Sequence, residues 1–94
     1  MKLIINTPSS EKITPNARMC PGVWTFIAEY INLDEPGYIF NFIDWVSEAV
    51  NNPTEGDMAK QAQKFLTQTG DWHQYLEGYS LDHAKHEIYM EFGS

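Results

Sequence analysis

The chain has 94 residues, of which 43% are hydrophobic and 14% aromatic, and its formal net charge at pH 7 is −7. This length fits a single domain over residues 1–94, and the apolar fraction is too high for an intrinsically disordered chain. The negative charge disfavours direct binding to nucleic acid or to an anionic membrane, and it favours partners with basic surfaces. Cys20 is the single cysteine, which excludes a scaffold held together by internal disulfides.

The N-terminal segment does not look like a targeting signal. Residues 1–8 carry one basic residue and only a short apolar stretch, far less than the apolar core of a signal peptide. No apolar run in the sequence approaches the ~20 residues that a membrane-spanning helix needs. We therefore expect a cytoplasmic location.

Two segments in the first third of the chain predict strands. Residues 2–6 are mostly apolar and β-branched and are soon followed by Pro8, which predicts a short first strand. Residues 7–22 contain three prolines and predict an irregular connection. Residues 23–31 are rich in β-branched and aromatic side chains and favour a strand, although their apolar positions also fit one face of a helix.

Residues 34–50 predict a helix. Asp34 suits the N-cap position, and Glu35-Pro36 suits the first turn, where a carboxylate favours the helix dipole and proline loses no hydrogen bond. Apolar residues then recur at helical spacing, at Ile39, Phe42, Ile43, Val46 and Val50. Phe40 and Trp45 lie outside this stripe, so the predicted helix has more apolar surface than one core contact needs.

Two further helices are expected in the C-terminal half. Thr54 suits the N-cap of a helix that runs to about Gln68 and ends at Gly70. Its periodicity places four apolar residues inward, Met58, Ala62, Phe65 and Leu66, and four polar residues outward, Lys60, Gln61, Gln63 and Lys64. Asp71 suits the N-cap of a short third helix that Gly78 closes.

The C-terminal segment predicts a strand. Residues 85–92 alternate between the two sides, with Ile88, Met90 and Phe92 on one side and polar residues or tyrosine on the other. Together these elements predict an α+β fold, in which a small antiparallel sheet that includes both chain ends packs against two or three helices.

The sequence contains no recognised catalytic or metal-binding motif. Asp82, His83 and His86, with His73, have the residue types of a zinc site, but neither a cysteine pair nor an H-E-x-x-H helix accompanies them. We interpret the histidines as surface residues. Cys20 lies in a Met-Cys-Pro-Gly turn without the signature of a nucleophilic cysteine, and no serine lies in a G-x-S-x-G motif. We expect a protein that is not an enzyme and holds no metal or cofactor.

The acidic residues are the most informative feature. Between Met19 and Ala59 there are seven carboxylates and no lysine or arginine. The predicted helix places Asp44 and Glu48 one turn apart on its solvent side, where like charges repel each other. A solvated helix face is the ordinary explanation, but repulsion without a nearby lysine favours a functional one. The candidate partner-binding residues are Glu29, Asp34, Glu35, Asp44, Glu48, Glu55, Asp57, Glu87 and Glu91.

Aromatic residues are interleaved with these acids. Phe40, Trp45 and Tyr89 lie close in the sequence to several of the acids. Two interpretations are open. The rings complete the core or a dimer seam, or they belong to a contact surface on which they anchor the partner while the carboxylates steer it.

The chain resembles the phage-encoded anti-restriction proteins of the T4-type Arn kind. The shared features are small size, the base-free acidic stretch over residues 19–59, the single Cys20 and the absence of a catalytic constellation. These proteins are DNA mimics, in which carboxylates take the place of phosphates. The resemblance implies a homodimer in the cytoplasm of an infected or host bacterium, a restriction endonuclease or another basic DNA-binding protein as its partner, and no cofactor.

Two other functions fit the same composition. An immunity-type inhibitor of a nuclease toxin is also acidic and carries aromatic anchors, but it matches the active site of one enzyme. A phage structural or assembly protein that is not an enzyme is acidic only for solubility, and its binding depends little on salt.

Overall fold

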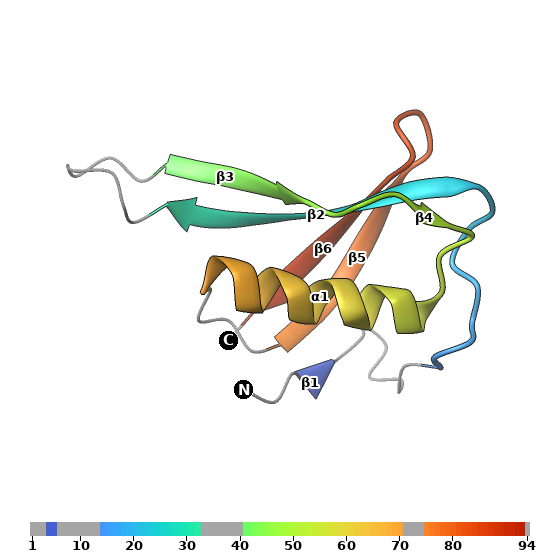
Figure 1. The fold of residues 1–94 in the computed structure, drawn as a ribbon, viewed down its shortest axis with the longest axis horizontal. Coiled ribbons are helices and arrows are strands. Elements are labelled where there is room, and N and C mark those ends of the chain that lie inside the picture. Colours follow the sequence, from blue (N-terminus) through green and yellow to red (C-terminus); the bar gives the residue numbers. More distant parts are fainter. Residues whose placement is uncertain (1–3, 6–13, 33–40, 71–74, 94) are drawn as a thin grey trace.

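The computed structural model describes residues 4–5, 14–32, 41–70 and 75–93. Within them lie β1 Ile4–Ile5, β2 Val23–Asn32, β3 Asn41–Val46, β4 Val50–Asn51, α1 Glu55–Thr69, β5 Tyr75–Asp82 and β6 Glu87–Gly93. The strands form one sheet in the order β1-β5-β6-β2-β3, and β4 pairs with β2 beyond the end of β3. α1 packs on one side of this sheet (Figure 1). None of the described helices has the length and apolarity to cross a bilayer.

The architecture corrects the predicted fold class. The sheet is mixed, because β1 pairs with β5 and β2 with β6 in parallel, while the β5–β6, β2–β3 and β2–β4 pairs are antiparallel. Among the described residues α1 is the only helix, where two or three were predicted. The protein is therefore mostly sheet, and the α+β class with a small antiparallel sheet describes it only loosely.

The helix predicted over residues 34–50 is wrong in its described part, which forms β3 and β4. The β3 sequence is rich in β-branched and aromatic residues, which fit a pleated strand. Pairing with β2 also sets its alternation, so that Ile43 and Trp45 lie on the α1 side of the sheet and Phe42 on the other. Since both faces of β3 carry apolar residues, the spacing imitates a helical stripe. The expected cap at Asp34 lies outside the described residues.

The third predicted helix is also wrong where the structure describes it. Residues 75–82 form β5, which pairs with β6 along most of its length. Gly78 does not end a helix and instead follows a register shift between Leu76 and Gly78. The expected cap at Asp71 lies outside the described residues. The strands predicted over residues 23–31 and 85–92 are confirmed as β2 and β6.

The helix predicted from Thr54 is confirmed as α1. The Thr54 hydroxyl accepts from the Asp57 N–H at 3.1 Å, and the Asp57 carboxylate accepts from the Thr54 N–H at 3.0 Å, which completes a capping box. Gly70 ends the helix in the left-handed conformation, with φ 68°, and donates its N–H to the Leu66 carbonyl. Gln61 differs from the prediction, because its side chain is buried together with the apolar face.

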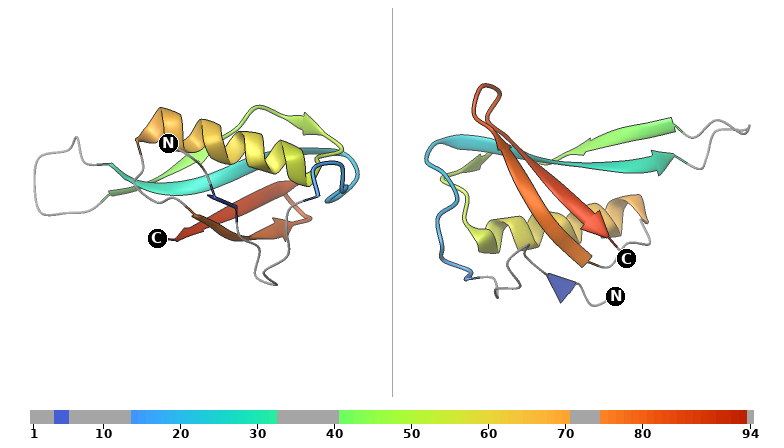
Figure 2. Two further views of the ribbon diagram at one scale, coloured as in Figure 1. Left: turned by 90° about the horizontal axis from the view of Figure 1, so that it is seen from below. Right: turned by 180° about the vertical axis from the view of Figure 1, so that it is seen from behind.

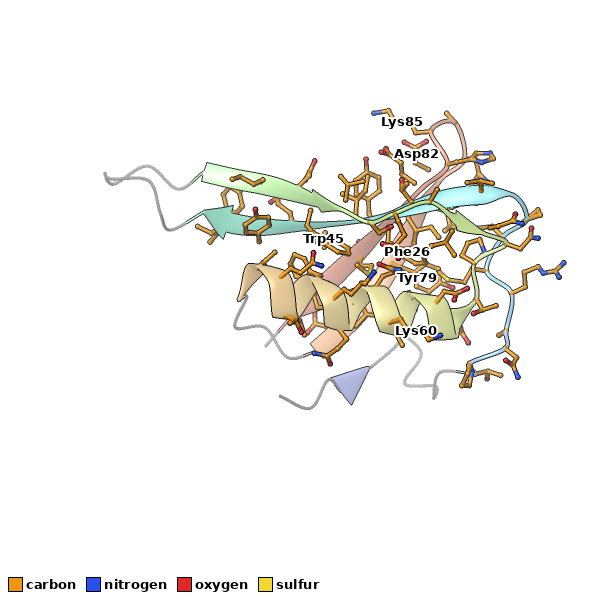
Figure 3. The ribbon with its side chains drawn as sticks, in the orientation of Figure 1. Phe26, Trp45, Lys60, Tyr79, Asp82 and Lys85 are labelled. Atoms are coloured by element: carbon orange, nitrogen blue, oxygen red, sulfur yellow. The ribbon has the colours of Figure 1, made fainter. Side chains whose placement is uncertain are left out.

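The core lies between α1 and one face of the sheet. Phe65 of α1 is fully buried, and three aromatic rings surround it: Phe92 at 4.9 Å, Trp45 at 5.8 Å and Tyr30 at 6.2 Å between ring centroids. The buried strand residues of the same core are Trp24, Phe26, Ala28, Leu76, Ile88 and Met90. Phe26, Tyr79 and Trp45 point into the space between the sheet and the helix (Figure 3).

α1 covers only one face of the sheet. In both views of Figure 2, α1 lies against one side of the sheet, and no described segment lies over the opposite side. Within the described part of the chain, therefore, no second layer covers the alternating residues of β2, β3 and β6 that point away from α1.

Candidate functional site

The uncovered side of the sheet, here called the open face, brings acidic and apolar side chains together. In β2, every second residue from Val23 points away from the core. The antiparallel register places residues of β3 opposite these, on the same side: Val46 opposite Ile27, Asp44 opposite Glu29, and Phe42 opposite Ile31.

β6 and β5 extend the open face on the other side of β2. The parallel register places Glu87 beside Thr25 and Tyr89 beside Ile27. Asp82 of β5 lies opposite Glu87. The open face thus consists of Val23, Thr25, Ile27, Glu29, Ile31, Phe42, Asp44, Val46, Ser80, Asp82, Glu87, Tyr89 and Glu91.

Apolar exposure is confined to this face. The large hydrophobic side chains that remain exposed in the described chain all belong to it: Val23 at 54%, Ile31 at 36%, Phe42 at 62% and Val46 at 55%. Ile27, at the centre of the face, is only 3% exposed and lies between Val46 and Tyr89 in the register. The Glu29–Asp44 pair lies between Val46 and Phe42, so this face alternates exposed apolar and acidic side chains.

Carboxylates on the open face are close enough to interact. Glu29 and Asp44 are directly opposite each other and exposed, an arrangement that destabilises an isolated sheet. The hydroxyl of Tyr89 donates to Glu87 at 3.0 Å. This hydrogen bond, together with the loss of solvent and the negative charges of Glu87, Asp82 and Asp44, raises the pKa of Tyr89. Acids from β3, β5 and β6 therefore share one negative environment.

No basic side chain compensates these carboxylates within the described residues. The one ion pair found there joins Lys64 of α1 to Glu48, whose nitrogen and oxygen are 2.9 Å apart. Gln61 donates to the same oxygen at 3.0 Å, and the two hydrogen bonds lower the pKa of Glu48 from 4.5 to about 2. Glu48 thus differs from the acids of the open face, because α1 has already supplied its partner.

The structure divides the nine predicted partner-binding acids into groups. Four of them lie on the open face: Glu29, Asp44, Glu87 and Glu91. Asp34 and Glu35 lie outside the described residues. The remaining three have structural partners, since Glu48 pairs with Lys64, Asp57 forms the capping box, and Glu55 accepts from the Thr14 N–H at 3.0 Å.

The predicted pairing of Asp44 and Glu48 on a helix is wrong. Asp44 is in β3 and Glu48 follows the end of that strand. The lysine that the local sequence lacks is provided by Lys64, sixteen residues further on. Asp44 instead finds its like-charged neighbour across the sheet, in Glu29 of β2.

Two groups of residues on the open face were not predicted. By sequence, Asp82 is a candidate only as part of a possible metal site. The periodicity places Phe42 and Val46 in the apolar stripe of a helix, and it assigns Val23 and Ile31 to no particular face of their strand. The signal for β3 was present in the alternation Phe-Ile-Asp-Trp-Val over residues 42–46. Trp45, a candidate for the contact surface, is instead half-buried against α1 and donates its Nε1–H to Gln68 at 2.8 Å. Phe40 lies outside the described residues.

The two described histidines pack on Trp24. His86 stacks on the indole, with ring centroids 4.5 Å apart, and His83 meets it edge-on at 5.4 Å. His86 Nδ1 is 3.0 Å from the Val23 carbonyl, which fastens the β5–β6 turn to the beginning of β2. No three histidine, cysteine or acidic side chains among the described residues are grouped so as to hold a metal ion. His73 lies outside them.

Cys20 is buried in the core cluster that also contains Trp24. Burial raises the pKa of its thiol, which disfavours the reactive thiolate.

No protein-family model, curated protein or solved structure matches this chain. The resemblance to DNA-mimic proteins therefore stays a prediction, and the open face is the basis on which a function can be argued.

Proposed function

We propose that this chain is a non-enzymatic, cytoplasmic binding protein whose open face covers a basic surface of another protein. The observation that carries this proposal is the pair Glu29 and Asp44. These residues face each other, with no cation from the described part of the chain, on the same surface that exposes Phe42 and Val46. A partner that supplies lysine or arginine removes the repulsion between the two carboxylates. Burial of the apolar side chains then contributes most of the contact energy, while charge steers the association.

The proposed partner is a protein that normally binds nucleic acid, such as a restriction endonuclease. Such a protein has a basic surface shaped for the regular negative charge of a duplex. The net charge of −7 and the acids gathered on the open face support this choice. In this mode the chain is an inhibitor, because its carboxylates occupy the positions of phosphates and exclude DNA.

A second candidate is an immunity-type inhibitor that binds a single nuclease toxin. The exposed Phe42 and Val46 favour it, since a general imitation of DNA requires charge but no apolar side chains. A matched partner with apolar pockets uses them as anchors, and specificity follows from their fit.

Displacement of DNA tests the proposal. A fluorescent duplex is bound at low salt to a restriction endonuclease, to a histone-like protein and to a nuclease-toxin domain, and its anisotropy is followed as the chain is added. We expect the wild-type chain to displace the duplex. The double variant Glu29→Gln with Asp44→Asn should need at least about tenfold more protein and show a weaker dependence on salt, because charge attraction is screened by ions.

The matched control removes the same two charges elsewhere, through Glu48→Gln with Glu55→Gln. These residues pair with Lys64 and with the Thr14 N–H, away from the open face, so this variant should displace DNA like the wild type. Displacement from several panel members supports DNA mimicry, and tight displacement from the toxin domain alone supports the second candidate. Failure to displace DNA from any of them, or equal weakening of both variants, contradicts the proposal.

A further inference from the structure

β3 has one free edge in the described structure. The strand order ends at β3, which pairs with β2 on one side and with no described strand on the other (Figure 1). The opposite end of the sheet is β1, a strand of only two residues, Ile4–Ile5. β3 has six residues and contains neither proline nor lysine, the residues that commonly protect an edge from pairing. It is therefore the described edge strand that is long enough to accept another strand.

The register shows which backbone groups of β3 face the free edge. The Ser47 N–H donates to the Phe26 carbonyl at 2.8 Å, and the Phe26 N–H donates to the Ser47 hydroxyl at 2.8 Å, so the backbone groups of positions 26 and 47 point toward each other across the pair. In an antiparallel ladder such positions alternate with positions whose backbone groups point outward. The backbone groups of Trp45 and Ile43, two and four positions before Ser47, therefore bond to β2. The N–H and C=O groups of Phe42, Asp44 and Val46 point to the free edge.

The same three residues present their side chains on the open face. Along the free edge the order is therefore apolar, acidic, apolar, with Phe42 and Val46 exposed by 62% and 55%. A strand added beside β3 places its own alternate side chains directly opposite these three. A lysine or arginine opposite Asp44 also lies near Glu29, the next carboxylate across the sheet.

We infer that the partner binds by adding an extended segment to β3, with a basic residue opposite Asp44 and apolar residues opposite Phe42 and Val46. This inference rests on the proposed function, because it specifies how the open face engages its basic partner. Backbone hydrogen bonds to the edge then provide affinity, and the alternate side chains provide specificity.

A second copy of the chain fits this edge less well. Antiparallel pairing of two β3 strands centred on Asp44 places the two Asp44 carboxylates opposite each other. A shift of one position in the centre places each Asp44 opposite Phe42 or Val46, where no cation is present. Either arrangement leaves the Glu29 and Asp44 carboxylates of both copies without a basic partner.

The test uses a seven-residue peptide with blocked ends and the pattern Thr-Val-Thr-Lys-Thr-Val-Thr, added to the full chain. We expect protection of the Phe42, Asp44 and Val46 amides from hydrogen exchange, measured by NMR. Asp44→Asn should weaken binding at least about tenfold, and so should replacement of the peptide lysine by glutamate. The added strand is antiparallel to β3, so the N–H groups of Lys and the two Val residues point to β3 and those of the two central Thr residues point away. Methylation of the Lys and Val nitrogens should therefore abolish binding, whereas methylation of the two central Thr nitrogens should preserve it.

Equal binding of the two methylated peptides, or chemical-shift changes over the open face without protection of these three amides, would overturn strand addition. Protection of the three amides in the free chain at high concentration would also overturn it, since a second copy would then occupy the edge. The two proposals fail separately. If the chain displaces DNA but its complex with the displaced protein leaves these amides unprotected, only strand addition is wrong. If no DNA is displaced, the proposed function is wrong whatever the peptide does.

Discussion

Glu48 illustrates how the fold changes the meaning of a single acidic residue. By sequence it belongs to the base-free stretch over residues 19–59, which predicts repulsion from Asp44 with no lysine nearby. Lys64 and Gln61 of α1 both reach its carboxylate, at 2.9 and 3.0 Å. The pairing depends on how two distant elements dock, so no local pattern predicts it. Asp44, four residues earlier, has no ion pair with any described residue and lies opposite Glu29.

The Glu48–Lys64 pair predicts a definite pH dependence. The folded state holds the pKa of Glu48 at about 2, below its usual 4.5, so the pair stabilises the fold fully above about pH 4.5. That stabilisation is lost as the pH falls through about 2. We expect Glu48→Gln to melt at a lower temperature than the wild type near neutral pH. This difference in melting temperature should disappear as the pH falls from about 4.5 to about 2.

Thermal unfolding followed by circular dichroism over this range measures the gap. High salt should reduce it, because both side chains are about half exposed and their attraction is screened. Gln63→Ala, on the same helix but outside the pair, serves as the control and should show no such pH dependence. A gap that is constant, or that grows on acidification, would show that Glu48 acts through packing.

At the scale of the elements, the start of α1 is held by the segment before β2. The Gly56 N–H donates to the Pro15 carbonyl at 3.0 Å, and the Glu55 N–H donates to the Ala17 carbonyl at 2.9 Å. This close contact requires glycine at position 56, since a Cβ there would lie 2.7 Å from the Pro15 oxygen. The described part of the irregular connection predicted over residues 7–22 is thus hydrogen-bonded to the start of α1.

Gly56→Ala should therefore destabilise the protein, although alanine favours helices by about 0.5–1 kcal/mol over glycine. The added methyl group must displace a backbone oxygen, and we expect a net loss of about 1–3 kcal/mol, typical of overpacking. Urea unfolding measures this loss, with Lys60→Ala on the exposed side of α1 as a control that should change little. An increase in stability for Gly56→Ala would show that the Pro15 segment moves away at little cost.

The elements that could be predicted are those with one clear period or a strong cap. α1 has a capping residue, an amphipathic face and a terminal glycine, and β6 has a clean alternation. β3 was mistaken for a helix because it is apolar on both faces, so that its spacing satisfies both periods. β5 was mistaken for part of a helix because Asp71 is a plausible N-cap and Gly78 a plausible helix end. Only its pairing with β6 decides the matter.

For the molecule as a whole, the sequence predicted the charge of the candidate site but not its composition. Glu29, Asp44 and Glu87 come from three segments of the chain. They share a face only because β2 lies between β3 and β6 in the sheet. The parallel pairing of β2 with β6 joins residues about sixty positions apart, which no local pattern encodes. The apolar part of the open face depends on the same topology.

That combination of charge and apolar exposure predicts how the molecule behaves near its isoelectric point. At pH 7 the net charge of −7 opposes contact between copies. Close to the isoelectric point of about 4.7 this opposition vanishes, and Phe42 and Val46 are free to make apolar contacts. We expect the average mass in light scattering to rise between pH 7 and pH 4.7.

The double variant Phe42→Ser with Val46→Thr should suppress this rise, whereas Ala49→Ser with Ala84→Ser, at exposed positions off the open face, should not. Equal association of both variants would mean that general isoelectric precipitation, and not the open face, brings the copies together. A dimer already present at pH 7 that survives the Phe42 and Val46 substitutions would confirm the predicted homodimer. It would also show that the dimer seam does not depend on the side chains of Phe42 and Val46.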